Sequence, residues 1–191
     1  MKNALPRLSM LLAIAGILSL FLFPMWKIIL YAPQYPTGVQ MNIWINKIDG
    51  NEPGTLQNVN ILNHYVGMKY IEPDAIPELT YFPYVIIAMA CLGLVALIIN
   101  RPWAYLSWML LMIGLSMIGF YDFYLWEYDY GHNLSDTAPI KIPGASFQPP
   151  LLGKKIILNF TAVSLPHIGG YLAGAGIVFS FLAYWSRKKL S

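Results

Sequence analysis

Two side chains with soft-metal chemistry lie four positions apart in the stretch NHYVGM, namely His64 and Met68. Imidazole and thioether groups suit Cu(I) in an oxidising compartment, where a free thiolate would be vulnerable. If the helix that carries His64 continues past Gly67, both residues share one helical face. If the helix stops at Gly67, Met68 folds back beside His64. The alternative interpretation is ordinary packing in a loop helix, because one His and one Met at this spacing are a weak signal.

Two further residues could complete such a site. Met41 lies in the alternating stretch VQMNIWINKI, which predicts a half-buried strand that would bring a third ligand from the side. His132 follows Asp129 by three positions in YDYGHNL, a pairing that suits a metal site or a proton relay. The alternatives are packing of both methionines in a core and a solvated turn at His132. The resulting hypothesis is a copper site formed by His64, Met68, Met41 and His132.

Catalytic chemistry has no comparable candidate in the sequence. The chain contains no GxxxxGK[ST] loop, no GxSxG, no HExxH and no CxxCH motif. Its single cysteine, Cys91, excludes an internal disulfide and is expected to be a small buried apolar residue. The formal net charge of +3 is modest, so a nucleic-acid partner is not indicated. We therefore expect a protein that is not an enzyme.

The composition indicates a membrane protein. Hydrophobic residues make up 57% of the chain and charged residues only 11%, whereas soluble domains carry about 25% charged residues. Four apolar segments each approach the roughly 20 residues that a helix needs to cross the hydrocarbon layer. We expect an all-α membrane fold, in which four transmembrane helices form a bundle and two long loops form a small mixed extracytoplasmic cap. The expected helices cover 1–26, 83–99, 103–123 and 168–186, the loops 27–82 and 124–167, and the tail 187–191.

The basic residues predict the orientation. Six of the twelve Lys and Arg residues, and no acidic residues, lie at the N-terminus, in the turn between the second and third helices, and at the C-terminus: Lys2, Arg7, Arg101, Arg187, Lys188 and Lys189. Because cytoplasmic loops of membrane proteins carry an excess of Lys and Arg, both termini are expected in the cytoplasm of a bacterium, with the chain in its inner membrane. The basic start of the chain also resembles a signal peptide, but the long apolar run favours a retained helix.

Local patterns predict some structure within the loops and one close helix contact. Apolar positions in TLQNVNILNHYV predict a helix, with Thr55 as its N-cap and Gly67 as its stop. The second loop is rich in Pro and Gly and is expected to be extended chain packed against the first. Gly170 and Gly174 form a GxxxG pattern, to which Gly176 adds a further small residue, and this face would pack within the bundle or against another subunit.

Three longer phrases carry a resemblance. APQYPTGVQMNIWINKI, NILNHYVGMKYIEP and APIKIPGASFQPPLLGKKIILNF resemble a family of small bacterial multi-pass membrane proteins. The genes of this family lie alongside those for nitrous oxide reductase and its copper-maturation factors. The resemblance implies an envelope protein that serves copper supply or the assembly of a copper enzyme, and it adds weight to the copper interpretation of NHYVGM.

Two functions are consistent with these patterns. The first is a membrane-bound accessory factor that binds Cu(I) through loop His and Met residues and serves maturation of a periplasmic copper enzyme of the nitrous oxide reductase type. The second is a non-catalytic assembly or anchoring subunit of a membrane complex, in which the histidines are structural. Both imply contact with membrane lipid and with protein partners in the membrane or periplasm.

Overall fold

The computed structural model describes residues 4–142, 144 and 146–190. Parts of the expected first helix, second loop and tail, at 1–3, 143, 145 and 191, lie outside the described residues. Four helices are long and apolar enough to cross a membrane: α1 (Ala4–Leu18), continued by the short helix η1 (Ser19–Phe21), then α3 (Glu78–Ile99), α4 (Pro102–His132) and α5 (Ile168–Lys188). The membrane character that the composition predicts is therefore confirmed at the level of helix length and hydropathy.

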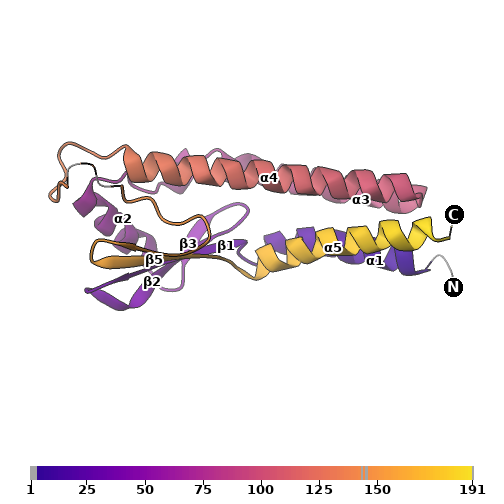
Figure 1. Cartoon of the computed structure of the whole chain (residues 1–191), viewed down its shortest axis with the longest axis horizontal. Helices are drawn as coiled ribbons and strands as arrows, with labels where there is room; N and C mark the ends of the chain where they lie inside the picture. The colour runs from indigo at the N-terminus through magenta and orange to yellow at the C-terminus, as the bar shows by residue number, and fades with distance from the viewer. Residues whose placement is uncertain (1–3, 143, 145, 191) are drawn as a thin grey trace.

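The four long helices form two layers (Figure 1). One layer pairs α1 with α5, and the other pairs α3 with α4. The α1–α5 pair is close because glycine faces backbone: a Cβ atom on Gly16 would come within 2.6 Å of the Leu172 carbonyl oxygen, and one on Gly176 within 2.9 Å of that of Ala13. Of the predicted small-residue face, only Gly176 packs against another long helix. A Cβ atom on Gly174 would meet nothing within 4 Å, and one on Gly170 would lie nearest the Met25 carbonyl oxygen.

The tight turn between α3 and α4 is held by side chains from two layers. Asn100 ends α3 in the left-handed conformation, with φ 48°, and Pro102 begins α4 at a position where a missing N–H costs nothing. The Tyr105 hydroxyl donates to Asn100 Oδ1 at 2.9 Å, and Arg187 Nε donates to the Asn100 carbonyl at 2.7 Å. These contacts tie the turn to the C-terminal end of α5, close to both chain ends (Figure 1).

The opposite end of the bundle carries a five-stranded antiparallel sheet. Its strands are β1 (Trp26–Ala32), β2 (Tyr35–Ile43), β3 (Ile48–Gly50), β4 (Gly153–Ile157) and β5 (Phe160–Pro166), in the order β3-β2-β1-β5-β4. The central strand β1 pairs Ile28 with Met41 on one side and with Ser164 on the other. Because β1 and β5 come from different loops, the two expected outer loops do pack together, as one sheet.

The expectation of an all-α fold is wrong, because this sheet makes the protein mixed α/β. The alternation between Val39 and Ile48 revealed only part of the sheet. The stretch KIILYA, which forms most of β1, is a short apolar run next to a membrane helix, and such a run does not distinguish strand from helix by periodicity. Its partner β5 lies more than a hundred residues away in the sequence, so no local pattern predicts the pairing.

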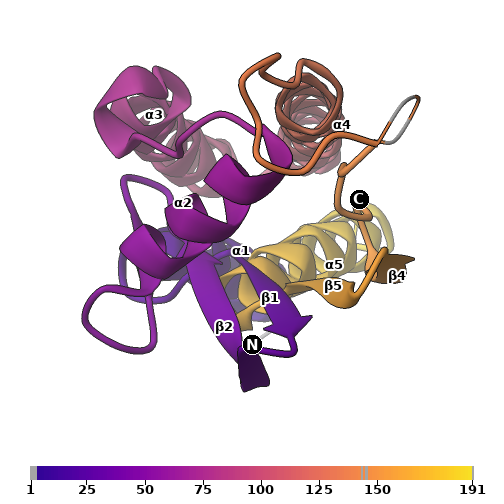
Figure 2. The same ribbon diagram turned by 90° about the vertical axis from the view of Figure 1, so that its left-hand side faces the viewer.

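A cap forms where helices cover one face of the sheet. The helix α2 (Thr55–Val66) lies between the sheet and the ends of α3 and α4, as the end-on view shows (Figure 2), and a short helix η2 (Pro73–Ala75) leads into α3. Ile28, Met41 and Val59 are buried between the sheet and α2, and Phe123 and Trp126 of α4 pack against the same cluster. The last turns of α4 therefore belong to the cap, not only to the bundle.

Candidate functional site

The stretch around His64 is a helix end followed by a reversal of the chain. The helix α2 stops at Gly67, which adopts φ 81°, and the Met68 N–H donates to the Asn63 carbonyl at 2.9 Å. This is the 6→1 hydrogen bond that closes a helix with a left-handed glycine. The prediction of a stop at Gly67 is confirmed, and the N-cap is Gly54 instead of Thr55, which is the first helical residue. His64 and Met68 are thus not one turn apart on a continuous helix.

Asparagine side chains of α2 hold the reversed segment in place. Asn60 donates to the Ile71 carbonyl at 3.1 Å and accepts from the Ile71 N–H at 2.8 Å, as a two-point clamp on the backbone. Asn63, which is buried, donates to the Lys69 carbonyl at 3.2 Å. These bonds satisfy backbone groups that would otherwise need water, so the segment after Gly67 lies in register against α2.

His64 and Met68 line the same open pocket. The exposed imidazole of His64 stacks on the ring of Tyr70, with centroids 6.1 Å apart and planes 10° apart. The other wall comes from the segment after α4, including Asn133 and Leu134. Met68 is half-buried and also packs against the cluster that contains Val66 and Phe147. The pocket therefore offers one solvated imidazole and one partly buried thioether.

His132 lies elsewhere, at the end of α4. Its ring stacks on Tyr128 at 3.9 Å between centroids, and its Nδ1 lies 3.0 Å from the Tyr128 carbonyl oxygen, which can only accept a hydrogen bond. The neighbouring Asp129 is engaged by Lys69, at 2.6 Å, and by the Asn133 amide. Neither residue of the proposed Asp129–His132 pair thus uses the other as its hydrogen-bond partner.

Met41 lies in the sheet core. Its side chain is only 3% exposed, packed between β1 and α2. The structure therefore brings His64 and Met68 together and leaves Met41 and His132 outside their pocket. In the part of the chain that the structure describes, no group of three or more His, Cys, Asp or Glu side chains could hold a metal ion. Of the four predicted ligands, the lining of one pocket joins only His64 and Met68, one imidazole and one thioether.

Cys91 also differs from expectation. It is exposed on α3, instead of buried, so its thiol lies on the surface of an apolar helix. Exposure here means exposure of a candidate membrane span, whose outer side chains would meet lipid. The residue lies in the middle of the span, far from the cap in sequence and in the fold.

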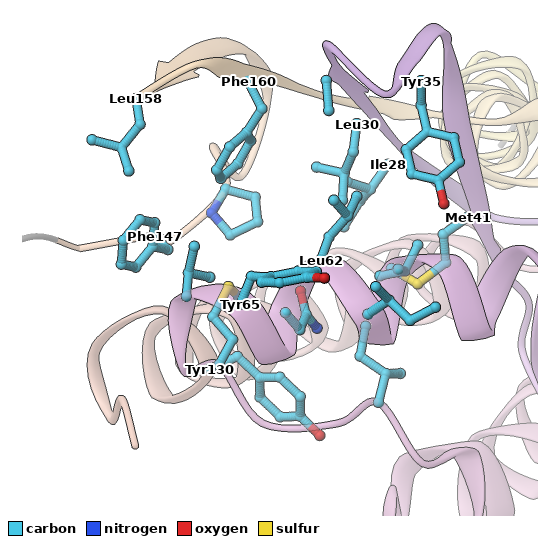
Figure 3. Close-up of a pocket in the computed structure, with 18 of the residues that line it drawn as sticks. Ile28, Leu30, Tyr35, Met41, Leu62, Tyr65, Tyr130, Phe147, Leu158 and Phe160 are labelled. Carbon is cyan, nitrogen blue, oxygen red and sulfur yellow. The ribbon is translucent and has the colours of Figure 1, made fainter. Parts of the chain in front are cut away.

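A second cavity lies inside the cap, with a volume of about 430 Å³. Figure 3 shows strand residues Ile28, Leu30 and Met41 on one side of it and Leu62 and Tyr65 of α2 along its floor. Phe147, Leu158 and Phe160 close another side. The walls are mainly apolar, which is typical of a site for a small organic molecule.

One acidic side chain, Glu127, lines this cavity. It is 0% exposed, and neither carboxyl oxygen has a hydrogen-bond partner among the described residues. Sequence reasoning missed it because Glu127 was placed in the second loop, whereas α4 continues through it to His132. The missed signal was the helical spacing of Phe123, Trp126 and Tyr130, which together form an apolar face beyond the end of the expected span.

Comparison with known proteins found no matching family model, no matching curated protein and no matching solved structure.

Proposed function

We propose that this chain is a non-catalytic accessory subunit of a membrane complex, in which four helices anchor an α/β cap that binds another protein. The observation that supports this most directly is the apolar surface of the β4–β5 hairpin. Leu152, Ile156 and Leu158 are 63%, 71% and 50% exposed at the outer end of the sheet. Exposed apolar side chains in and beside an edge strand of a cap are typical of a protein-binding surface.

The partner should present apolar and acidic groups. Lys154 and Lys155 precede Ile156 on β4, and both are exposed. β4 is the last strand in the sheet order, and lysines on an edge strand discourage unspecific strand pairing. Because successive strand residues point to opposite faces, Lys154 shares a face with Ile156, and Lys155 lies on the other face. The positive charge beside Ile156 favours an acidic rim on the partner. We name these five residues, Leu152, Lys154, Lys155, Ile156 and Leu158, the hairpin surface.

Co-purification tests this function. The tagged chain is extracted from native membranes with a mild non-ionic detergent, and its partners are identified after cross-linking. We expect a defined partner to co-purify with the wild type. It should no longer co-purify with the Ile156→Asp variant, and its binding to the Lys154→Glu variant should be weaker. The matched control is Glu52→Lys, a charge reversal at an exposed turn on the other side of the sheet order, before α2. A wild-type chain that always runs alone would contradict the proposal.

Copper handling is the second candidate, favoured by the meeting of His64 and Met68 in one pocket. In this proposal the pair binds Cu(I), and the protein serves the supply of copper to a periplasmic copper enzyme of the nitrous oxide reductase type. An imidazole and a thioether would hold the soft ion without a thiolate. Since two donors from the chain make an incomplete shell, the bound ion would remain accessible to an acceptor.

The copper proposal is tested by the affinity of the purified protein for Cu(I), measured by competition with a chromophoric chelator. Met68→Leu keeps the apolar volume in the core but removes the thioether, and His64→Gln removes the imidazole at an exposed position. We expect each variant to weaken binding. Met41→Leu is the matched control, because it makes the same change in the sheet core, outside the pocket. Equal binding by wild type and the His64→Gln, Met68→Leu double variant would exclude the site.

We further infer that the membrane is a bacterial inner membrane and that both termini face the cytoplasm. What supports this is the gathering of basic side chains at one end of the bundle. Arg101 begins the turn that Arg187 holds, and Lys188 and Lys189 follow at the same end (Figure 1). The excess of Lys and Arg in cytoplasmic segments then places the cap outside.

A further inference from the structure

The cap cavity has the size and the opening of a ligand site. Its volume of about 430 Å³ lies within the range of small-molecule pockets. Four of the side chains that line it are also strongly exposed, so that the cavity opens to the surface between α2 and the β4–β5 turn: Ile61, Tyr65, Ile140 and Leu158. A small molecule could therefore enter without unfolding of the cap.

Glu127 is the unexplained polar group in this cavity. Its carboxyl is fully buried, and both Oε atoms are without hydrogen bonds among the described residues. Burial of such a group without a partner is costly, so folded proteins almost always satisfy it. Lys155 acts on Glu127 electrostatically, but its Nζ donates instead to the Gln148 carbonyl at 3.0 Å, and its side chain is exposed. This lysine is thus engaged elsewhere.

The remaining walls favour a positive charge. Among the described residues that line the cavity, Glu127 is the only Asp, Glu, Lys, Arg or His side chain. Aromatic side chains stand beside it in sequence and around it in the cavity, with Trp126 and Tyr130 from α4 and Tyr65 from α2. The negative face of an aromatic ring attracts ammonium ions, and a desolvated carboxylate adds a charge-assisted hydrogen bond. The apolar walls at Leu30, Leu62 and Phe147 would accept a hydrocarbon body.

We propose that this cavity binds an organic ammonium ion with an apolar body, whose N–H groups donate to Glu127 and whose hydrocarbon part fills the space between α2 and the strands. This inference does not rest on the proposed function, because it needs neither a protein partner nor copper. It shares Leu158 and Lys155 with the hairpin surface, and Met68 lines both pockets. The same chemistry occurs in a free amine and in the ethanolamine headgroup of a lipid. The ammonium group is common to both, and the experiment below distinguishes the free amine from the lipid headgroup.

The test uses the purified full-length chain in a non-ionic detergent and 2-phenylethylammonium as the probe, with binding measured by isothermal titration calorimetry. We expect saturable binding by the wild type. The neutral analogue 2-phenylethanol should bind at least about tenfold more weakly to the same protein, because it cannot form the charge-assisted contact. This comparison needs no variant and stands even if substitutions at Glu127 disturb folding.

Two variants locate the site. Glu127→Gln keeps the shape of the side chain. It should lower the affinity for the ammonium probe by at least about tenfold and change the affinity for the alcohol little. Lys155→Gln is the control, because it removes the cation that could compete for Glu127, and it should bind the probe as tightly as the wild type or more tightly. Displacement of the probe by phosphatidylethanolamine, but not by phosphatidylglycerol, would identify a lipid headgroup as the source, and displacement by neither would identify a free amine.

Three results would overturn the proposal. The first is the absence of saturable binding by the wild type in detergent that contains no ethanolamine lipid. The second is equal affinity for the ammonium ion and the alcohol, or an unchanged affinity in Glu127→Gln. The third is binding that appears only in Lys155→Gln, since that would make the lysine the natural partner of Glu127. None of these results bears on co-purification through the hairpin surface, so the two proposals fail separately.

Discussion

At the scale of single residues, one tryptophan joins the sheet to the helices. The indole N–H of Trp26 donates to the hydroxyl of Ser164 at 2.7 Å across the central pair of strands. The ring of Trp26 also meets the edges of Phe120 and Phe123 on α4, with centroids 5.4 and 6.0 Å apart. Ser164 in turn donates to the Leu151 carbonyl at 3.2 Å, before β4. A single fully buried hydroxyl therefore connects three segments of the cap.

We predict that Ser164→Ala lowers the free energy of unfolding by about 1–3 kcal/mol, because it leaves the buried indole N–H without a partner. Unfolding in detergent, followed by circular dichroism, would measure the change. In the Trp26→Phe background the same substitution should cost less, since the donor is already gone. Equal costs in the two backgrounds would show that the hydrogen bond contributes nothing to stability.

At the scale of elements, the glycines of the α1–α5 pair differ in what surrounds them. Gly16 of α1 and Gly176 of α5 lie against the backbone of the opposite helix, whereas Gly174 has open space around it. Close backbone approach is the usual way in which small residues join helices in a membrane. The GxxxG pattern found in the sequence is therefore only a partial guide, because Gly170 faces the Met25 carbonyl, at the entrance to the sheet, and not another long helix.

We expect Gly16→Ala to destabilise the α1–α5 pair by roughly 1–3 kcal/mol, since its methyl group would come within 2.6 Å of the Leu172 carbonyl oxygen and backbone cannot yield cheaply. Gly174→Ala is the matched control and should be neutral or slightly stabilising, because it adds a methyl group in open space and alanine favours the helix. Titration of the folded protein with a denaturing detergent would compare the two. A Gly174→Ala variant as unstable as Gly16→Ala would contradict this packing.

The elements also show what could be predicted from the sequence. The four long helices were recognisable because hydrophobic length alone identifies them, and the end of α2 was recognisable because Gly67 follows an apolar helical face. The central strand pair was not recognisable, because β1 and β5 are short apolar runs that are stabilised as strands only by pairing with each other. The carboxyl of Glu127 was missed for a related reason: its burial depends on α2 and on the segment around Phe147, which no pattern within α4 reveals.

At the scale of the whole molecule, the two ends of the bundle differ both in shape and in charge. The cap occupies one end of the bundle, and the chain ends and the α3–α4 turn occupy the other (Figure 1). The basic residues Arg101, Arg187 and Lys188 lie at the end without the cap, and the carboxylates Asp49 and Asp129 lie in the cap. A molecule with this separation of charge would insert with one preferred orientation.

We predict that a cysteine at Glu52 reacts with a membrane-impermeant maleimide in spheroplasts, whereas a cysteine at Lys189 reacts only after the membrane is permeabilised. Both substitutions are made in a Cys91→Ser background, so that the native thiol on α3 gives no signal. Glu52 lies exposed in the cap and Lys189 directly after α5. Labelling of Lys189→Cys before permeabilisation would contradict cytoplasmic termini.

The central strand pair also sets the order in which the protein can be made. Trp26 and Ser164 are 138 residues apart, so ribosomes deliver β1 long before its partner β5. Until α3, α4 and then β5 have been synthesised, one edge of β1 has no strand to pair with. Contacts between such distant segments form slowly and late. Closure of the sheet therefore waits for β5, and a chain that ends before β5 would leave an open, aggregation-prone edge on β1.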